Sequence, residues 1–121
     1  MEETKIIEVS ITSLKITSED EWLDTYIKTS GDKVSDSPQY LALLGERSPL
    51  RDWMGFRGLD WLEGLRDILD VYVSLKKEGQ KEPILIYSDG RINTGHKRAA
   101  SALYLNWEKL KAVVVPDNYK L

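Results

Sequence analysis

Apolar residues recur along this chain with two spacings, and each spacing predicts a different kind of element. Near the N-terminus, isoleucine and valine alternate with polar residues, which is typical of a strand with one buried face. Two later apolar runs also predict strands. The second, which ends at Pro116, is apolar throughout, so we expect it to occupy a buried position in a sheet. Asp89-Gly90 follows the first run and predicts a tight turn, because glycine supplies a positive φ. The predicted strands are residues 5–11, 84–87, 91–93 and 112–115.

Helical spacing is clearest in the middle of the chain. Apolar side chains at intervals of three and four from Trp61 to Leu75 form one stripe, and Gly79 is a suitable end. An earlier amphipathic helix is expected after residues 18–21, where Ser18 and Glu21 fit a capping box. Further short helices are predicted over residues 40–44 and from Gly95 to Asn106, and exposed or irregular segments over residues 29–38 and 46–60.

These elements predict one α+β domain over residues 1–121, with a small mixed β-sheet flanked by helices and with residues 17–58 as a helical and loop insertion. The chain of 121 residues is long enough to form its own hydrophobic core. No apolar run is long enough to span a bilayer, and the first residues lack the apolar stretch of a signal peptide. We therefore expect no membrane association and a cytoplasmic location.

Composition narrows the chemistry. The chain has no cysteine and one histidine, His96, which excludes disulfides and cysteine nucleophiles and disfavours a structural zinc site. A serine triad would also need His96, but no G-x-S-x-G turn accompanies it. The net charge of −3 disfavours a dedicated nucleic-acid-binding protein.

Three contiguous basic residues lie where the helix after residue 95 is expected to begin. Cations at a helix N-terminus are unfavourable by a few tenths to about 1 kcal/mol each, because the free N–H groups there are already partly positive. A bound anion would reverse that sign, and the motif therefore predicts a phosphate site. The alternative is a solvated turn whose cations pair with surface carboxylates such as Asp89. The residues of the predicted site are Thr94, Gly95, His96, Lys97 and Arg98.

The segment 46–60 offers a second group of candidates. Arg47 or Arg51 would clamp a phosphate, and Glu46 would act as a base or as a magnesium ligand; the alternative is a solvated loop. Glu46 and His96 are the two catalytic candidates, His96 as a hydrogen-bond donor or an acid/base. The carboxylates that could hold Mg²⁺ are Asp89, the metal-ligand candidate, and Glu46, Asp52 and Asp60, although Asp89 also fits a plain hairpin turn.

Two of the four tryptophans bear on the function. Trp61 begins the longest apolar stripe, and we expect it in the core. Trp53 lies in the segment predicted to be irregular, where it could stack on a base or anchor a partner.

Several segments resemble the ParB/sulfiredoxin superfamily. They are the first strand, Glu82-Pro83-Ile84-Leu85-Ile86, Asp89-Gly90-Arg91-Ile92, Gly95-His96-Lys97-Arg98-Ala99-Ala100 and the closing Leu110-Lys111-Ala112-Val113-Val114-Val115. The resemblance is best over residues 61–115. It implies a compact domain whose glycine-led turn between a strand and a helix holds nucleotide phosphates.

The turn differs among members of the superfamily. In ParB proteins, which bind and hydrolyse CTP, it reads G-E-R-R; Gly95 and Arg98 match, and Lys97 is a conservative change. Related serine kinases carry D-G-H-H-R, in which Gly95, His96 and Arg98 match and Thr94 replaces the acidic residue. Sulfiredoxin uses a cysteine at this turn, and the absence of cysteine here excludes that reduction.

Motif and resemblance together predict a domain that binds ATP or CTP with Mg²⁺. If the domain is an enzyme, we expect it to hydrolyse the nucleotide or to transfer a phosphoryl group to a small molecule. One alternative is a non-catalytic module with a protein or DNA partner, suggested by Thr94 and by the Trp53 segment. A third is a ParB-like nuclease, which would need a cluster of metal-binding carboxylates. The base preference, the phosphoryl acceptor, the oligomeric state and the pathway stay open.

Overall fold

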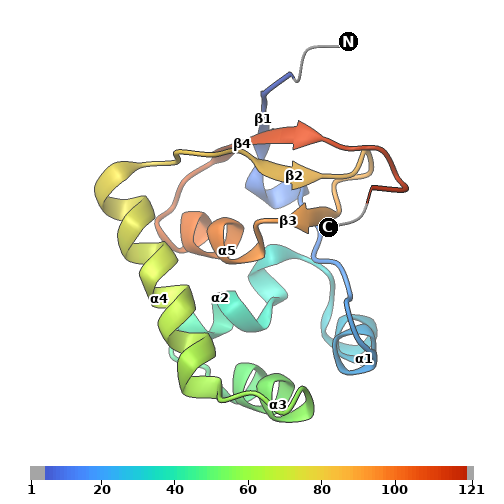
Figure 1. The fold of residues 1–121 in the computed structure, drawn as a ribbon, viewed down its shortest axis with the longest axis vertical. Coiled ribbons are helices and arrows are strands. Elements are labelled where there is room, and N and C mark those ends of the chain that lie inside the picture. Colours follow the sequence, from blue (N-terminus) through green and yellow to red (C-terminus); the bar gives the residue numbers. More distant parts are fainter. Residues whose placement is uncertain (1–4, 120–121) are drawn as a thin grey trace.

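The computed structural model describes residues 5–119, which form an α+β domain with a four-stranded mixed sheet and five α-helices (Figure 1). The strands are β1 (Ile7–Ser10), β2 (Ile84–Ile86), β3 (Ile92–Thr94) and β4 (Lys109–Val114). The helices are α1 (Glu21–Ser30), α2 (Pro38–Leu43), α3 (Ser48–Phe56), α4 (Trp61–Glu78) and α5 (His96–Tyr104), with 3-10 turns at Ile11–Ser13 and Val34–Asp36. The predicted α+β class with a mixed sheet is confirmed.

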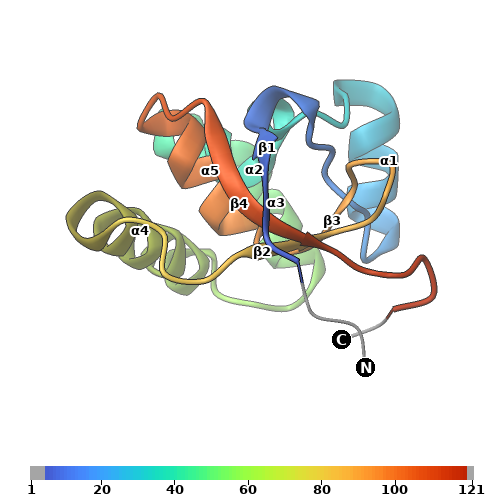
Figure 2. The same cartoon turned by 90° about the horizontal axis from the view of Figure 1, so that it is seen from above.

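The sheet has the order β1-β4-β2-β3. Strand β4 is antiparallel to β1 and parallel to β2, and β2 pairs antiparallel with β3 in the predicted hairpin. In Figure 1 the helices lie below the sheet, and the view from above in Figure 2 shows the strands crossing in front of α2 and α3. Because helices cover one face, exposed and buried residues alternate at the start of β4, and Val114 is 46% exposed. The expectation that residues 112–115 are buried throughout was therefore wrong at Val114.

Two hydrophobic clusters form the core. The sheet cluster consists of Ile11, Leu14, Val34, Leu75, Ile84, Ile86, Ile92, Ala99, Ala100, Ala102, Leu110 and Ala112. The helical cluster consists of Leu23, Ala42, Leu50, Trp53, Met54, Leu65 and Ile68. Helix α4 contributes to both clusters, and Leu43 packs against both. The two clusters are thus joined by α4 and by the end of α2.

Helix α3 lies in the segment for which an irregular structure was expected. Pro49 occupies the first turn, where its missing N–H breaks no helical hydrogen bond. Leu50, Trp53 and Met54 follow at intervals of three and one, so they share one face, and all three are buried. The segment was expected to be irregular because it holds Pro49, Gly55 and Gly58 among several charges, but Pro49 lies in the first turn, Gly55 near the end of the helix and Gly58 beyond it.

The predicted loop over residues 29–38 is also more ordered than expected. Helix α1 extends to Ser30, and Val34 and Ser37 are buried. The Ser37 hydroxyl donates to the Val34 carbonyl at 2.7 Å and accepts the Tyr40 N–H at 3.1 Å, which caps α2. Val34, Ser37 and Pro38 therefore belong to the packed interior, whereas residues 29, 30, 33 and 35 are exposed as expected.

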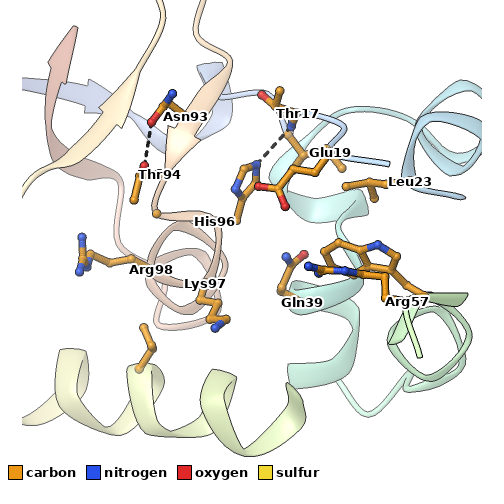
Figure 3. A pocket seen from close by; sticks show the side chains of 14 residues that line it. Thr17, Glu19, Leu23, Gln39, Arg57, Asn93, Thr94, His96, Lys97 and Arg98 are labelled. Carbon is orange, nitrogen blue, oxygen red and sulfur yellow. Dashed lines mark hydrogen bonds between the residues drawn. The ribbon is translucent and has the colours of Figure 1, made fainter. Parts of the chain in front are cut away.

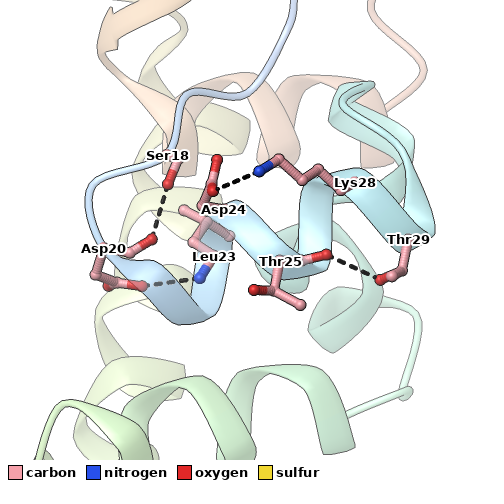
Figure 4. Close-up of polar contacts among 7 residues, drawn as sticks. All are labelled: Ser18, Asp20, Leu23, Asp24, Thr25, Lys28 and Thr29. Atoms are coloured by element: carbon pink, nitrogen blue, oxygen red, sulfur yellow. Dashed lines mark hydrogen bonds and ion pairs between the residues drawn. The ribbon is translucent and has the colours of Figure 1, made fainter.

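The start of α1 differs from the predicted capping box. Figure 4 shows Asp20 as the capping residue: its Oδ1 accepts the Leu23 N–H at 2.8 Å, and Ser18 donates to the Asp20 carbonyl at 2.8 Å. The helix begins at Glu21, two residues later than a Ser18 cap implied. A carboxylate suits this position because it also faces the positive end of the helix dipole.

Within residues 5–119, none of the helices combines the length and the apolar character that crossing a membrane requires.

Candidate functional site

A cavity of about 390 Å³ lies between the N-terminal end of α5 and the helices α1, α2 and α3 (Figure 3). Of the seven residues predicted to bind phosphate, the lining includes the five of the turn, Thr94 to Arg98, but neither Arg47 nor Arg51. The facing wall comes from α1, α2 and α3, through Leu23, Gln39 and Trp53, and from Arg57 just after α3. The motif singled out in the sequence therefore opens onto a concave surface.

Gly95 determines how α5 meets the sheet. Its φ is +119°, outside the range that side-chain-bearing residues readily adopt. A Cβ at this position would lie 2.4 Å from Cγ2 of Ile84 in β2. Gly95 is the N-cap and provides no capping side chain, and the first turn of α5 holds no acidic residue. The N–H groups of that turn, which lack helical partners, are left uncapped by any side chain of residues 5–119.

His96 is a neutral hydrogen-bond acceptor rather than a cation. Its Nε2 accepts the backbone N–H of Thr17 at 3.2 Å, which assigns the ring proton to Nδ1 (Figure 3). Burial of the ring lowers the pKa of His96 to about 4. The sequence counted three basic residues at this helix end, but at neutral pH only Lys97 and Arg98 are charged.

Lys97 and Arg98 leave α5 in different directions (Figure 3). The Lys97 Nζ lies 3.9 Å from the Asp67 carboxylate of α4. The Arg98 guanidinium donates to the Glu82 carbonyl at 3.4 Å. Both side chains line the cavity, but they do not converge on one point. Both contacts are long and exposed, so little free energy opposes a change of rotamer.

The other two arginines of the predicted site lie elsewhere. Arg47 precedes α3 as its N-cap, and Arg51 is exposed on α3, 3.4 Å from Asp52. Neither lines the cavity, and Glu46, the catalytic candidate, is exposed in the same connection between α2 and α3. Arg57, which the sequence did not single out, is the arginine of this region that lines the cavity. Trp53 and Arg57 are four residues apart, so on a helix they share a face. The sequence would have indicated Arg57 as a cavity residue only if α3 had been predicted.

Trp53 is buried, and the expectation that it lies exposed in a loop was wrong. Its indole N–H donates to Asp20 Oδ2 at 2.8 Å, and Trp22 stacks against it with centroids 6.4 Å apart. The Arg57 guanidinium lies 5.3 Å from the Trp53 ring centroid. Trp61, expected in the core, is only partly buried at the edge of the helical cluster. Trp53 thus contributes one fixed aromatic wall of the cavity.

Asp89, the candidate metal ligand, is engaged within its own turn. The Arg91 backbone N–H donates to it at 3.0 Å and the Arg91 guanidinium at 2.7 Å. These bonds hold the pKa of the Asp89 carboxyl below its ordinary value. Asp60 likewise caps α4 through the Leu62 N–H, at 3.0 Å. Over residues 5–119, no group of three or more Asp, Glu, His or Cys side chains is arranged to hold a metal ion.

Comparison with protein-family models, with curated proteins and with solved structures finds no match for this chain. The assignment of a function therefore depends on the residues themselves.

Proposed function

We propose that this protein binds a nucleotide, ATP or CTP, by its phosphates at the N-terminal end of α5. The observation that carries the proposal is the cavity in front of the uncapped first turn of α5, at which Gly95 brings the backbone close to β2. Uncapped N–H groups and the helix dipole favour an anion at this place. Without a ligand, only the long contacts of Lys97 with Asp67 and of Arg98 with the Glu82 carbonyl offset the cost of placing these cations at the positive end of the helix.

The charges around the cavity support the same proposal. Its charged lining consists of Arg57, Lys97, Arg98 and Glu19, whereas the whole chain carries a net charge of −3. Two of these cations also lie near carboxylates outside the lining, Arg57 at 4.0 Å from Asp20 and Lys97 at 3.9 Å from Asp67. Arg98 has no carboxylate partner within residues 5–119, so the positive charge is concentrated on its side of the cavity. The cavity volume of about 390 Å³ is within the range of roughly 300–1,000 Å³ for small-molecule sites.

The finer fold assignment is part of the proposal. A ParB/sulfiredoxin-like domain would bind phosphate at a glycine-led turn between a strand and a helix, and here Gly95 joins β3 to α5. Thr94 stands where the related kinases carry an acidic residue. The Mg²⁺ would accordingly arrive with the nucleotide phosphates, rather than at a carboxylate site of the chain.

Catalysis is the less supported extension of this function. Hydrolysis or phosphoryl transfer needs a group that orients the attacking oxygen, and the polar candidates in the cavity are neutral His96 and Glu19. Glu46 would have to move from its exposed position to take part. Release of inorganic phosphate from ATP or CTP, measured with and without Mg²⁺, decides between a binding protein and an enzyme.

Binding is tested by calorimetric titration with ATP, CTP and GTP, each with and without Mg²⁺. We expect at least one nucleotide to bind, and Arg98→Ala to weaken it about tenfold, the effect of losing one charge-assisted contact. Arg51→Ala is the matched control, because it removes the same charge outside the cavity. Binding that is absent for every nucleotide, or weakened equally by both substitutions, would contradict the proposal.

A second candidate, a protein-binding module, is favoured by one face of α4. Leu62, Leu69 and Val73 recur at intervals of seven and four, so they share a face, and they are 52%, 40% and 44% exposed. A protein partner would cover this face. If no nucleotide binds, Leu69→Lys should abolish association with such a partner without changing the melting temperature.

A further inference from the structure

Gln39 is a buried polar side chain without a hydrogen-bond partner. It is 8% exposed, and no hydrogen bond of its amide is found within residues 5–119. It lines the 390 Å³ cavity and also a neighbouring cavity of about 350 Å³ between α3 and α4. Figure 3 shows the amide projecting from α2 into the space between His96 and Arg57. The amide is open to the cavity rather than enclosed in the interior, so water or a ligand in the cavity can supply its hydrogen-bond partners.

A flat, fixed surface lies beside Gln39. The Arg57 guanidinium is planar and rests 5.3 Å from the centroid of the Trp53 ring. The Trp53 indole is itself held by Asp20, at 2.8 Å, and by the stacked Trp22. A planar cation held over an aromatic ring presents a surface on which a flat heterocycle can stack.

One carboxylate also faces this part of the cavity. Glu19 is the only acidic residue among the described lining residues, and Figure 3 shows its side chain extending toward His96, above Gln39. A carboxylate can accept a hydrogen bond from an amino group but repels a carbonyl oxygen. It is equally unfavourable for a phosphate, so the phosphates belong at the Lys97 and Arg98 side.

We propose that Gln39 binds the hydrogen-bonding edge of the nucleobase and that the Trp53–Arg57 pair supports its flat face. This inference rests on the proposed nucleotide binding at α5. A primary amide presents a donor beside an acceptor, so it can pair with cytosine or adenine (an amino group beside a ring nitrogen) and equally with uracil (a ring N–H beside a carbonyl oxygen). The preference comes from Glu19, which accepts from the amino group of cytosine and repels the carbonyl oxygen of uracil, and it favours CTP over UTP, two ligands that differ only at this edge.

The first experiment observes Gln39 directly by NMR. The chain has two glutamines, and their side-chain NH₂ signals can be followed while CTP, UTP or inorganic triphosphate is added. The Gln80 amide is an internal reference, because it is held by the Glu82 carbonyl at 3.0 Å and the Lys111 carbonyl at 2.8 Å. CTP should shift the Gln39 NH₂ signals, and inorganic triphosphate should shift only the backbone N–H signals at the start of α5.

The second experiment uses Gln39→Met, which keeps the size of the side chain and removes its amide. We expect the affinity for CTP to fall about tenfold, the affinity for inorganic triphosphate to stay within about twofold, and the melting temperature to stay equal or rise. Gln80→Met is the matched control with the opposite pattern. It removes three amide hydrogen bonds and should lower the melting temperature while leaving CTP binding intact.

The outcomes separate this inference from the function on which it rests. If inorganic triphosphate and CTP bind but Gln39→Met changes neither, the base site is wrong and the phosphate site stands. If Gln39→Met lowers the melting temperature and weakens both ligands alike, Gln39 is structural and the inference fails. If none of the three ligands binds the unmodified protein, both proposals fail.

Discussion

The sheet cluster and the helical cluster are built from different side chains. Every member of the sheet cluster is aliphatic, and three alanines of α5 allow the helix to approach the sheet closely. The helical cluster contains Trp53 and Met54 and is bordered by Trp22, Tyr26 and Trp61. Its short helices are connected through one carboxylate, Asp20, which caps α1 and accepts the Trp53 indole N–H.

This difference explains how the cavity is divided. In the proposed site, the sheet side contributes backbone groups at the glycine turn, which would bind the phosphates that all nucleotides share. The helical side contributes Gln39, Arg57 and the Trp53 ring, which would distinguish one base from another. Thr17 and His96 join the two sides through a single hydrogen bond of 3.2 Å.

The largest expected effect comes from removing core volume on either side. Ile84→Ala in the sheet cluster and Leu50→Ala in the helical cluster should each lower the free energy of unfolding by about 3 to 4 kcal/mol, because both side chains are at most 1% exposed. Since Leu43 and α4 pack against both clusters, each variant should unfold in one transition. Urea denaturation is followed by far-UV circular dichroism and by tryptophan fluorescence. Separate midpoints for the two probes would show that the clusters unfold independently.

Two glycines test how tightly each side constrains the backbone. Gly95→Ala should cost about 3 kcal/mol, because a positive φ is combined with a Cβ placed 2.4 Å from Ile84. Gly45→Ala, between α2 and α3, should cost only about 1 kcal/mol, because its φ is +98° but no atom lies within 4 Å of the added Cβ. Both values come from chemical denaturation. Equal losses would mean that the contact of α5 with β2 does not determine the turn.

The His96 bond between the two sides makes stability depend on pH. The unfolded chain takes up a proton near pH 6.5, but folded His96 does so only near its pKa of about 4. Stability therefore falls as the pH decreases through this window, by about 2 kcal/mol between pH 7.5 and pH 5. His96→Gln, which keeps an acceptor for the Thr17 N–H, should lose this component. The pH-dependent part of the stability is measured as the difference in the free energy of unfolding between the two proteins at each pH. If the two proteins had identical pH profiles, His96 would be solvated rather than buried.

The smallest expected effect concerns the ion pair of Lys97 with Asp67. Asp67→Asn should release Lys97 and raise the affinity for inorganic triphosphate about threefold at low salt, while changing stability by less than about 0.5 kcal/mol. Asp70→Asn is the matched control on the same helix, since Asp70 is exposed and has no ion pair within residues 5–119. An equal gain in both variants, measured by calorimetry, would reflect net charge alone.

The amino-acid sequence by itself determined most of the sheet side. The first strand, the β2–β3 hairpin and α4 follow from periodicity and turn residues, and Asn106 ends α5 with a φ of +63°, as its position indicated. These features depend on neighbours a few positions away along the chain. Gly95 also belongs here, because a glycine followed by basic residues at a helix start is visible without coordinates.

Only the tertiary structure decided the helical side and the chemistry of the cavity. Helix α3 has nine residues and a proline in its first turn, so its stability comes from packing that local propensity does not encode. The same packing places Arg57 rather than Arg47 or Arg51 at the cavity and directs the Gln39 amide into it. The charge of His96 was likewise undetermined by the sequence, because desolvation, set by residues distant along the chain, makes the imidazole neutral.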